Sequence, residues 1–274
     1  MHVLGGLKPA YDADGITLIH GDCLDVMPML TDRFDMVLAD LPYGTTRNHW
    51  DRELPNKLLW HGYHSVCGPR TPIVIFGSGS FSARFMVENL PEYRYSLVWA
   101  KKDEKGSDVS GVLNSKRQPL RVHEDLMVFY RNQPLYVPQM VHTGRSSHSR
   151  GKTVERTVNH YNEFKNTPAV DQGGYQYPQS VVEFRRPKMP KGHPGHPSQK
   201  PVALLRWLIR TYTNPGDLIL DNVAGSASTL IAARAEGRRA VGIEKHEPFV
   251  ELAAARLASG SDEDRWFTPQ QEAA

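Results

Sequence analysis

A carboxylate, a proline and an aromatic ring follow one short apolar run in the N-terminal half of the chain. The run is Met36-Val37-Leu38, and Asp40-Leu41-Pro42-Tyr43-Gly44 comes just after it. The Asp40 side chain could accept one N–H of an exocyclic amine, a backbone carbonyl beside Pro42 could accept the other, and Tyr43 could stack on the attached ring. The amine lone pair would then point at an incoming methyl group. Asp, Pro and Gly are also common turn residues, so an ordinary strand-to-loop turn stays open for this stretch alone.

The C-terminal half contains a strand, a loop of small residues, a helix and an acid in that order. Leu218 to Asp221 predicts the strand, and Asn222-Val223-Ala224-Gly225-Ser226-Ala227-Ser228-Thr229 predicts a loop that opens a helix over 230–235. Small side chains let a ligand approach the backbone, and the N–H groups of a helix start favour a carboxylate such as that of methionine. A strand over 240–243 then delivers Glu244 at the spacing that lets an acid accept both hydroxyls of a ribose in dinucleotide folds. A nicotinamide site is disfavoured because the loop lacks the full three-glycine spacing.

Regular apolar patterns predict the elements that position these two clusters. They predict strands over residues 16–20, 34–38, 72–77, 95–99, 125–130, 218–221 and 240–243, and helices over 54–66, 201–212 and 230–235. In open α/β folds, ligands bind at the carboxyl ends of the strands. We therefore expect Asp40 and Glu244 to face one crevice, with Asp22 nearby after the first strand.

Length and composition limit the class of protein. A chain of 274 residues can form a single α/β domain with an insertion. Cys23 and Cys67 are too few and too isolated for a disulfide scaffold or a thiolate zinc site, which suits a reducing compartment. We see no basic-then-apolar leader and no apolar run long enough to cross a bilayer. A cytoplasmic enzyme that does not contact a membrane and needs no metal is the expectation.

Basic residues concentrate in one segment. Residues 131–200 hold 11 Lys and Arg against 4 Asp and Glu, a local balance of +7, whereas the net charge of the whole chain is +3. Tyrosines are interleaved with these basic residues, a mixture that suits contacts to phosphates and base edges. The segment predicts a nucleic-acid-binding region, and a disordered basic linker remains the alternative.

Three motifs in this order resemble those of beta-type DNA amino methyltransferases, which act on adenine N6 or cytosine N4. Asp40-Leu41-Pro42-Tyr43 is similar to the DPPY signature, and His196-Pro197-Ser198-Gln199-Lys200-Pro201 is similar to the HPxQKP motif. Residues 217–229 are similar to the S-adenosylmethionine loop, and the resemblance covers roughly residues 16–258. The chain departs from the family at Leu41, Val223 and Ala227, where proline, phenylalanine and glycine are usual.

The resemblance implies a Rossmann-like class I S-adenosylmethionine-dependent methyltransferase fold of α/β class. Its sheet would be mixed and mostly parallel, with a circularly permuted motif order. It implies a single methyltransferase domain over 1–274 with an inserted target-recognition region over 131–192, and the polar composition of the last residues predicts a flexible tail over 261–274. The implied activity is methyl transfer from S-adenosylmethionine to adenine N6 in double-stranded DNA, after the base is flipped out. Cytosine N4 methylation, or a catalytically weak DNA-binding module, is the alternative.

The resemblance also assigns site residues. The catalytic set is Asp40, Leu41, Pro42 and Tyr43. The cofactor-binding set is Asp22, Asp40, Ser198, Gln199, Lys200, Asp221, Asn222, Val223, Gly225, Ser226, Ala227, Ser228, Glu244 and Lys245. The distribution of basic residues, and not the resemblance, gives the predicted DNA-binding set: Lys116, Arg117, Arg145, Arg150, Lys152, Arg185 and Arg186. His123-Glu124 could border the pocket of the flipped base or simply be a polar pair at a strand entry. A homodimer and a partner restriction endonuclease, as in restriction-modification systems, are compatible with the family.

Overall fold

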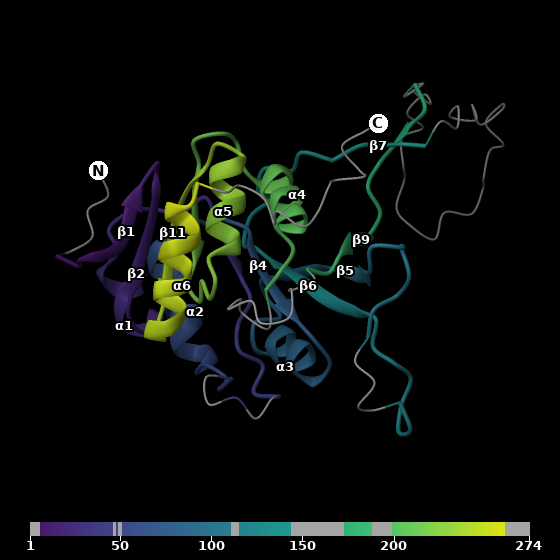
Figure 1. The fold of residues 1–274 in the computed structure, drawn as a ribbon, viewed down its shortest axis with the longest axis horizontal. Coiled ribbons are helices and arrows are strands. Elements are labelled where there is room, and N and C mark those ends of the chain that lie inside the picture. The colour runs from purple at the N-terminus through teal and green to yellow at the C-terminus, as the bar shows by residue number, and fades with distance from the viewer. Residues whose placement is uncertain are drawn as a thin grey trace.

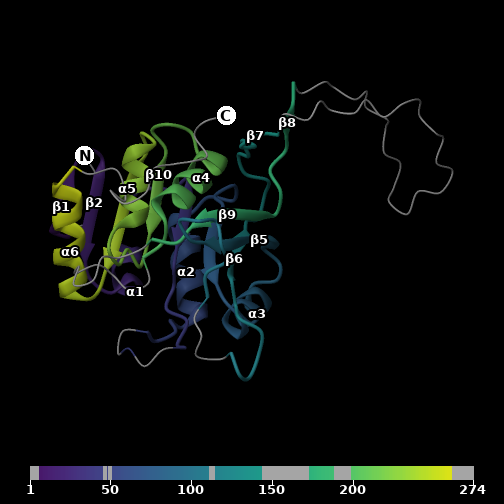
Figure 2. The same ribbon diagram turned by 45° about the vertical axis from the view of Figure 1, so that its right-hand side comes forward.

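Helices cover both faces of one large sheet (Figures 1 and 2). The computed structural model describes residues 6–45, 48, 51–110, 115–143, 173–187 and 199–260. Within these ranges nine strands pair in the order β1-β2-β11-β10-β3-β4-β6-β5-β9. They are β1 (Pro9–Ala13), β2 (Ile16–His20), β3 (Met36–Ala39), β4 (Ile73–Gly77), β5 (Tyr93–Lys102), β6 (His123–Phe129), β9 (Val181–Arg185), β10 (Leu218–Asp221) and β11 (Arg239–Glu244).

The strand directions bring many carboxyl ends to one edge of the sheet. Strands β2, β11, β10, β3 and β4 are parallel, and β1 pairs antiparallel with β2. Strand β6 is antiparallel to both β4 and β5, and β9 is parallel to β5, so β5 and β9 again run in the direction of β3. The predicted mostly parallel, mixed sheet is confirmed. We call the edge at which β2, β3, β10 and β11 end the carboxyl edge.

The pairing of β3 with β10 explains why the motif order is permuted. Val37 of β3 lies opposite Leu220 of β10, although the two residues are 183 positions apart in sequence. From this pair the chain proceeds to β4 on one side and to β11 on the other. Neighbouring strands whose crossovers run in opposite directions leave a crevice at their carboxyl ends. The catalytic signature and the small loop therefore meet although they lie in opposite halves of the chain.

Two apolar layers hold the sheet between its helices. Helices α4 (Val202–Tyr212), α5 (Ser228–Ala235) and α6 (Glu247–Ala258) pack on one face, and α1 (Cys23–Val26), α2 (Asn56–Val66) and α3 (Ser80–Glu88) pack on the other (Figure 1). In β10, Ile219 belongs to the first layer and Leu218 and Leu220 to the second. Strands that are buried on both faces are apolar throughout, so continuous apolar runs in the sequence predict them.

Strand β9 lies inside the segment 131–192 that the sequence assigned to an insertion. Residues 181–185 form an edge strand of the main sheet beside β5. Among the described residues of the segment, the short pair β7 (Val141–His142) and β8 (Tyr175–Gln176) stands apart from that sheet. The strand was missed because its burial alternates and Glu183 faces solvent, so no continuous apolar run marks it. Among the described residues no helix combines the length and the apolar composition needed to cross a bilayer.

Candidate active site

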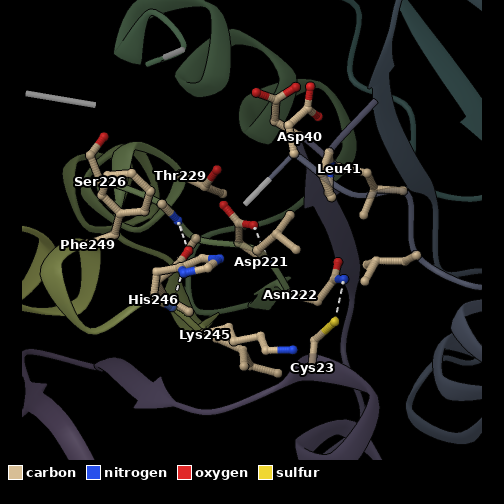
Figure 3. Close-up of a pocket in the computed structure, with 18 of the residues that line it drawn as sticks. Cys23, Asp40, Leu41, Asp221, Asn222, Ser226, Thr229, Lys245, His246 and Phe249 are labelled. Carbon is tan, nitrogen blue, oxygen red and sulfur yellow. Dashed lines mark hydrogen bonds between the residues drawn. The ribbon is translucent and has the colours of Figure 1, made fainter. Parts of the chain in front are cut away.

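One cavity of about 640 Å³ opens at the carboxyl edge and joins both predicted clusters. Asp40 reaches it from the end of β3, Gly225 from the loop after β10, and Glu244 from the end of β11. Figure 3 shows Asp40 and Leu41 beside Asp221, with Ser226 and Phe249 farther along the same cavity. Of the predicted catalytic and cofactor residues, these line it: Asp22, Asp40, Leu41, Pro42, Tyr43, Gln199, Lys200, Asp221, Asn222, Val223, Gly225, Ser226, Ser228, Glu244 and Lys245.

Both carboxylate oxygens of Asp40 have partners. The hydroxyl of Tyr43 donates to Oδ1 at 2.8 Å, and the ammonium of Lys200 lies 2.6 Å from Oδ2. Burial raises the pKa of Asp40 above its ordinary value, although the charge of Lys200 acts in the opposite direction. Burial and the neighbouring Asp40 carboxylate raise the pKa of Tyr43 well above its ordinary value, so its hydroxyl remains a proton donor. The ring of Tyr43 packs on Phe81 with 4.8 Å between centroids, and Phe81 therefore supports the ring from α3.

The turn after Asp40 is fixed by packing and by one carboxylate. Leu41 is 3% exposed and belongs to the apolar layer shared with α1–α3, so it contributes a core side chain where the DPPY signature that it resembles has proline. The two oxygens of Asp51 accept the backbone N–H groups of Gly44 (2.9 Å) and Thr45 (3.0 Å). Together these contacts hold the backbone of the signature in a defined path without a second proline.

The loop after β10 depends on Glu244. Its Oε2 accepts the N–H of Gly225 at 2.8 Å, and its Oε1 accepts the N–H of His246 at 2.8 Å. Gly225 has φ +52° and Ala227 has φ +65°, so two residues of the loop lie in the left-handed region that favours glycine. Ala227 does not line the cavity but is fully buried beneath the loop at the start of α5.

The far end of the cavity contains a second set of polar contacts. Asp22 caps α1 by accepting the N–H of Leu24 at 3.0 Å, and it pairs with the ammonium of Lys245 at 2.8 Å. Burial acts to raise the pKa of Asp22, but the hydrogen bond and charge of Lys245 and the N–H of Leu24 together outweigh burial, so the pKa is lowered. Asn222 accepts the hydroxyl of Tyr63 at 2.8 Å, which fixes the first residue of the loop after β10 to α2.

Asp221 is a buried acid whose charge is poorly compensated. Burial raises its pKa from 3.8 to about 7, and the carboxylates of Asp40 and Glu244 add to the rise, whereas bonds from Thr229 and the N–H of Val223 oppose it. A buried acid with a raised pKa favours the folded state while it is neutral, and this contribution is lost as pH rises from about 4 through about 7.

We therefore expect Asp221→Asn to stabilise the protein without bound ligand at pH 8 and to change its stability little at pH 4. Asparagine keeps an oxygen for the N–H of Val223 but carries no charge to desolvate, so the gain at pH 8 should be on the order of 2 kcal/mol. Chemical denaturation of both proteins at the two pH values measures it. An equal gain at both pH values would contradict the raised pKa.

The predicted DNA-binding residues are only partly within the described ranges. Lys116 and Arg117 are exposed in the segment between β5 and β6. Arg185 ends β9 and Arg186 follows it with its side chain exposed, which places both at the end of the sheet where β3 ends. The remaining predicted residues, Arg145, Arg150 and Lys152, lie outside the described residues, as do Ser198 and the predicted tail over 261–274.

Two residues support the site without lining the cavity: Glu124, which was expected with His123 either to border the pocket or to be a polar pair at a strand entry, and Arg256, which sequence reasoning missed. Glu124 of β6 contacts the ammonium of Lys200 at 3.2 Å and stands behind it instead of lining the cavity. Arg256 of α6 donates to the backbone oxygen of Ser226 and to the Ser226 hydroxyl (3.0 Å) and Ser228 hydroxyl (3.3 Å). An arginine inside a helix carries no spacing signal, so only the folded structure reveals the role of Arg256, and the contact of Glu124 with Lys200 depends on how the strands pack.

Comparisons with known proteins agree with this geometry. DNA adenine methyltransferase YhdJ of Escherichia coli (strain K12) is 26% identical over 274 aligned residues, which cover 92% of this chain and 86% of that protein. The solved complex of M1.HpyAVI with SAM is 20% identical, with a TM-score of 0.57, over 88% of this chain and 100% of that chain. PvuII DNA methyltransferase, which is cytosine-N4-specific, is 16% identical, with a TM-score of 0.62, over 97% and 91% of the two chains.

The structural likenesses confirm the predicted Rossmann-like methyltransferase fold. The family model N6_N4_Mtase, described as DNA methylase, matches residues 34–255. The match begins just before β3 and ends within α6, so it includes both the signature after β3 and the loop after β10. The chain therefore belongs to the N6/N4 family of DNA methylases.

Proposed function

We propose that this protein transfers a methyl group from S-adenosylmethionine to the exocyclic N6 of adenine in double-stranded DNA. One observation carries the proposal: Asp40 and Tyr43 share a single cavity with Gly225 and Glu244, although they come from opposite halves of the chain. A donor held by the second pair therefore lies beside a base held by the first. The cavity volume of about 640 Å³ is within the usual range for small-molecule sites.

The residues at the β10–β11 end fit the parts of S-adenosylmethionine. Glu244 is 7% exposed and uses one lone pair of each oxygen on a backbone N–H, so lone pairs remain for two ribose hydroxyls. The loop before α5 presents backbone N–H groups and small side chains to the carboxylate of methionine. Asp221 and Asp40 both line the cavity, so their carboxyl groups would face the sulfonium of a donor bound there. The sulfonium supplies an activated methyl group, so no covalent enzyme intermediate is needed.

The residues at the β3 end orient the amine. Asp40 accepts one N–H, and a backbone carbonyl of the Leu41–Pro42 turn accepts the other, so the nitrogen lone pair faces the methyl carbon. The new N–C bond forms as the C–S bond breaks with its electron pair left on sulfur, and the surplus proton then leaves the nitrogen for water. Such catalysis is largely positioning, because the reacting groups are already activated. A base inside a duplex cannot reach this cavity, so it must be flipped out at a cost of a few kcal/mol.

Adenine is favoured over cytosine by two observations. The acid of the signature is Asp40, as in the adenine-modifying members that its motif resembles, and the relative with 26% identity is named an adenine methyltransferase. Cytosine N4 is the second candidate, favoured by the likeness to the cytosine-N4-specific PvuII enzyme. Both bases present an exocyclic amine beside a ring nitrogen, so the contacts of Asp40 serve either one.

Labelled S-adenosylmethionine and mixed-sequence duplex DNA test the proposal. Transfer of label to DNA, followed by nucleoside analysis that finds N6-methyladenine, is the expected result. N4-methylcytosine would establish the second candidate. Binding of the donor without transfer to any DNA would instead indicate a DNA-binding module without turnover, and transfer only to structured RNA would change the substrate class.

DNA is proposed to lie along the carboxyl edge, with residues 131–192 as the target-recognition region. Arg185 ends β9 at this edge and Arg186 follows it. Arg121 donates to the Ser78 hydroxyl at 2.6 Å, just past the end of β4. Lys116 and Arg117 are exposed in the same connection as Arg121. Phosphate contacts from such residues position a duplex without reading its sequence.

We expect the double variant Arg185→Gln, Arg186→Gln to bind DNA about tenfold more weakly and to reduce the salt slope of log Kd by up to about 2. Each lost phosphate contact removes about one released counterion. The matched control is Arg33→Gln, Arg70→Gln, because these exposed arginines precede β3 and β4 at the opposite edge. Titration of DNA by fluorescence anisotropy at several salt concentrations measures both slopes. An unchanged slope in the first variant would exclude its arginines from the interface.

A further inference from the structure

A chain of alternating charges runs from Asp40 into the protein. Lys200 lies between Asp40 Oδ2 (2.6 Å) and Glu124 Oε2 (3.2 Å), and Lys101 lies 2.5 Å from Glu124 Oε1. Lys200 is 9% exposed, and its ammonium lies 5.1 Å from the centre of the Phe76 ring. A buried ammonium between two carboxylates is strongly held, because removing either partner leaves an uncompensated charge.

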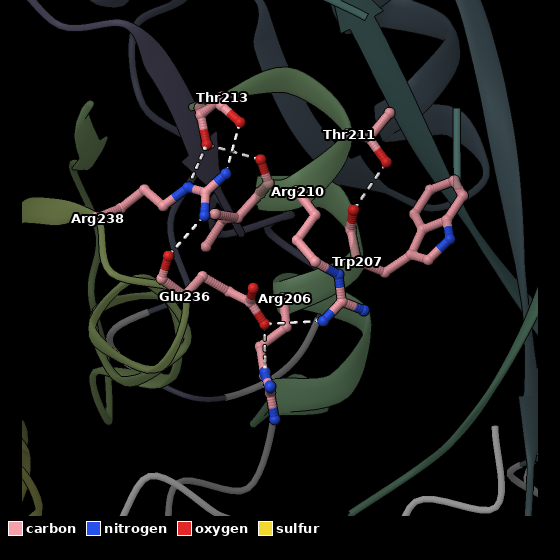
Figure 4. A network of polar contacts seen from close by, with 8 residues as sticks. Arg206, Trp207, Arg210, Thr211, Thr213, Glu236 and Arg238 are labelled. Atoms are coloured by element: carbon pink, nitrogen blue, oxygen red, sulfur yellow. Dashed lines mark hydrogen bonds and ion pairs between the residues drawn. The ribbon is translucent and has the colours of Figure 1, made fainter. Parts of the chain in front are cut away.

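The fold fixes the backbone from which Lys200 extends. Pro201 caps α4, and α4 is fastened to α5 because Glu236 accepts from Arg206 (2.6 Å) and from Arg210 (2.8 Å) (Figure 4). At the other end of the helix, the hydroxyls of Tyr212 and Tyr95 are 2.8 Å apart. Lys200 therefore has little freedom to leave Asp40 when a ligand enters the cavity.

The two oxygens of Asp40 differ in how easily their partners can be exchanged. Oδ2 is held by the ammonium of Lys200, a charged donor with a second carboxylate behind it. Oδ1 accepts only the neutral hydroxyl of Tyr43 among the contacts of the described residues. An amine N–H can replace a neutral hydroxyl at small cost, whereas displacing the ammonium would break the stronger charge-assisted bond. The target amine is therefore directed to Oδ1.

We propose that Lys200 is a positioning residue for methyl transfer, which holds Asp40 by Oδ2 so that Oδ1 faces the target amine, and that Glu124 holds Lys200 in turn. This inference rests on the proposed function and assigns Lys200 to the acceptor carboxylate instead of to the methyl donor. Tyr43 then has a second task besides stacking, because its hydroxyl occupies Oδ1 until the amine arrives.

Removing the charge of Lys200 and removing the charge of Glu124 should shift the pKa of Asp40 in opposite directions. The groups that face Asp40 are Lys200 before α4, Glu124 on β6, Tyr43 on its own loop and Asp221 on β10. Removing the charge of Lys200 takes away the main effect that lowers the pKa of Asp40, so that pKa rises. Removing the charge of Glu124 takes away a repulsive neighbour, so the pKa of Asp40 falls.

The test uses Lys200→Met, Lys200→Arg and Glu124→Gln in the full chain, with saturating S-adenosylmethionine and duplex DNA. Single-turnover methyl transfer in Lys200→Met is expected to fall about 100-fold, with donor affinity within about threefold, because a carboxylate displaced by about 1 Å costs that much. In the plot of transfer rate against pH, the acid limb of Lys200→Met should move to higher pH. The acid limb of Glu124→Gln should move to lower pH. Lys200→Arg should recover part of the rate, and it carries the test if Lys200→Met does not fold.

Lys102→Met is the matched control, because Lys102 also bridges two carboxylates, those of Asp108 (2.9 Å) and Glu183 (3.3 Å), but away from the cavity. It should leave the acid limb in place. A loss of donor affinity that parallels the loss of rate in Lys200→Met, or pH limbs that do not move, would overturn the proposal.

A readout without turnover separates this inference from the proposed function. The carboxyl pKa of Asp40 can be followed by ¹³C NMR, assigned with Asp40→Asn, in the wild type and in each variant without DNA. A rise in Lys200→Met and a fall in Glu124→Gln support the ion-pair chain even if the wild type methylates no DNA, which would remove the proposed function alone. An Asp40 pKa that both variants leave unchanged would remove the inference.

Discussion

Replacing Asp40 with alanine is expected to lower the rate of methyl transfer by about three orders of magnitude while donor binding stays within about threefold. The loss corresponds to about 4 kcal/mol of transition-state stabilisation. It arises because the amine loses the acceptor that aims its lone pair. Donor binding persists because Glu244 and the loop of Gly225 hold the other end of the cavity. Single-turnover transfer and calorimetric binding of S-adenosylmethionine measure the two quantities separately.

Two companion variants sharpen this result. Asp40→Asn keeps the shape of the side chain but cannot offer an oxygen to both the amine and Lys200 without turning its own NH₂ toward a donor. It should therefore lose nearly as much rate as Asp40→Ala. Asp25→Ala removes an exposed carboxylate in α1 that does not line the cavity, and it should behave like the wild type. Near-normal transfer by Asp40→Ala would remove Asp40 from the mechanism.

The central strands could be predicted because parallel strands covered on both faces have to be apolar. Met36-Val37-Leu38 and Leu218-Ile219-Leu220 are of this kind, and an acid follows each run within two residues at the carboxyl edge. Because the Asp40 signature and the small-residue loop after Asp221 lie in opposite halves of the chain, both halves had to contribute strands to one sheet. The pairing of β3 with β10 confirms that requirement, and it brings Asp40 into the same cavity as Gly225 and Glu244.

The partners of the site residues could not be predicted in the same way. The HPxQKP motif predicts that Lys200 contacts the cofactor. The structure adds a partner on β6, because the ammonium of Lys200 contacts Glu124, which is 76 positions away in sequence. Asp51 fixes the turn after Tyr43 by accepting the N–H groups of Gly44 and Thr45, which are seven and six positions before it. No local sequence pattern predicts these two hydrogen bonds. Such contacts depend on the register and direction of neighbouring strands. Local patterns specify which elements form, and packing then decides which side chains meet.

Glu244→Gln is expected to weaken binding of S-adenosylmethionine about 30-fold without unfolding the protein, because each lost hydrogen bond to a charged group costs about 1.5–3 kcal/mol. In the wild type, each carboxylate oxygen accepts a backbone N–H, from Gly225 or from His246. The glutamine side chain has one oxygen, so its NH₂ must face one of these N–H groups and lose that bond. The loop at Gly225 or the turn at His246 then shifts, and only one oxygen remains for the two ribose hydroxyls.

A donor analogue separates a direct role of Glu244 in holding the ribose from an indirect role in shaping the loop. Glu247→Gln is the matched control, because Glu247 is an exposed glutamate at the start of α6 that does not line the cavity, and its removal should leave donor affinity unchanged. A donor analogue that lacks the ribose hydroxyls should bind Glu244→Gln and wild type with similar affinity, since the bonds at issue are then absent from both complexes. If the analogue still discriminates between the two proteins as strongly as the intact donor does, Glu244 acts by shaping the loop and does not hold the ribose.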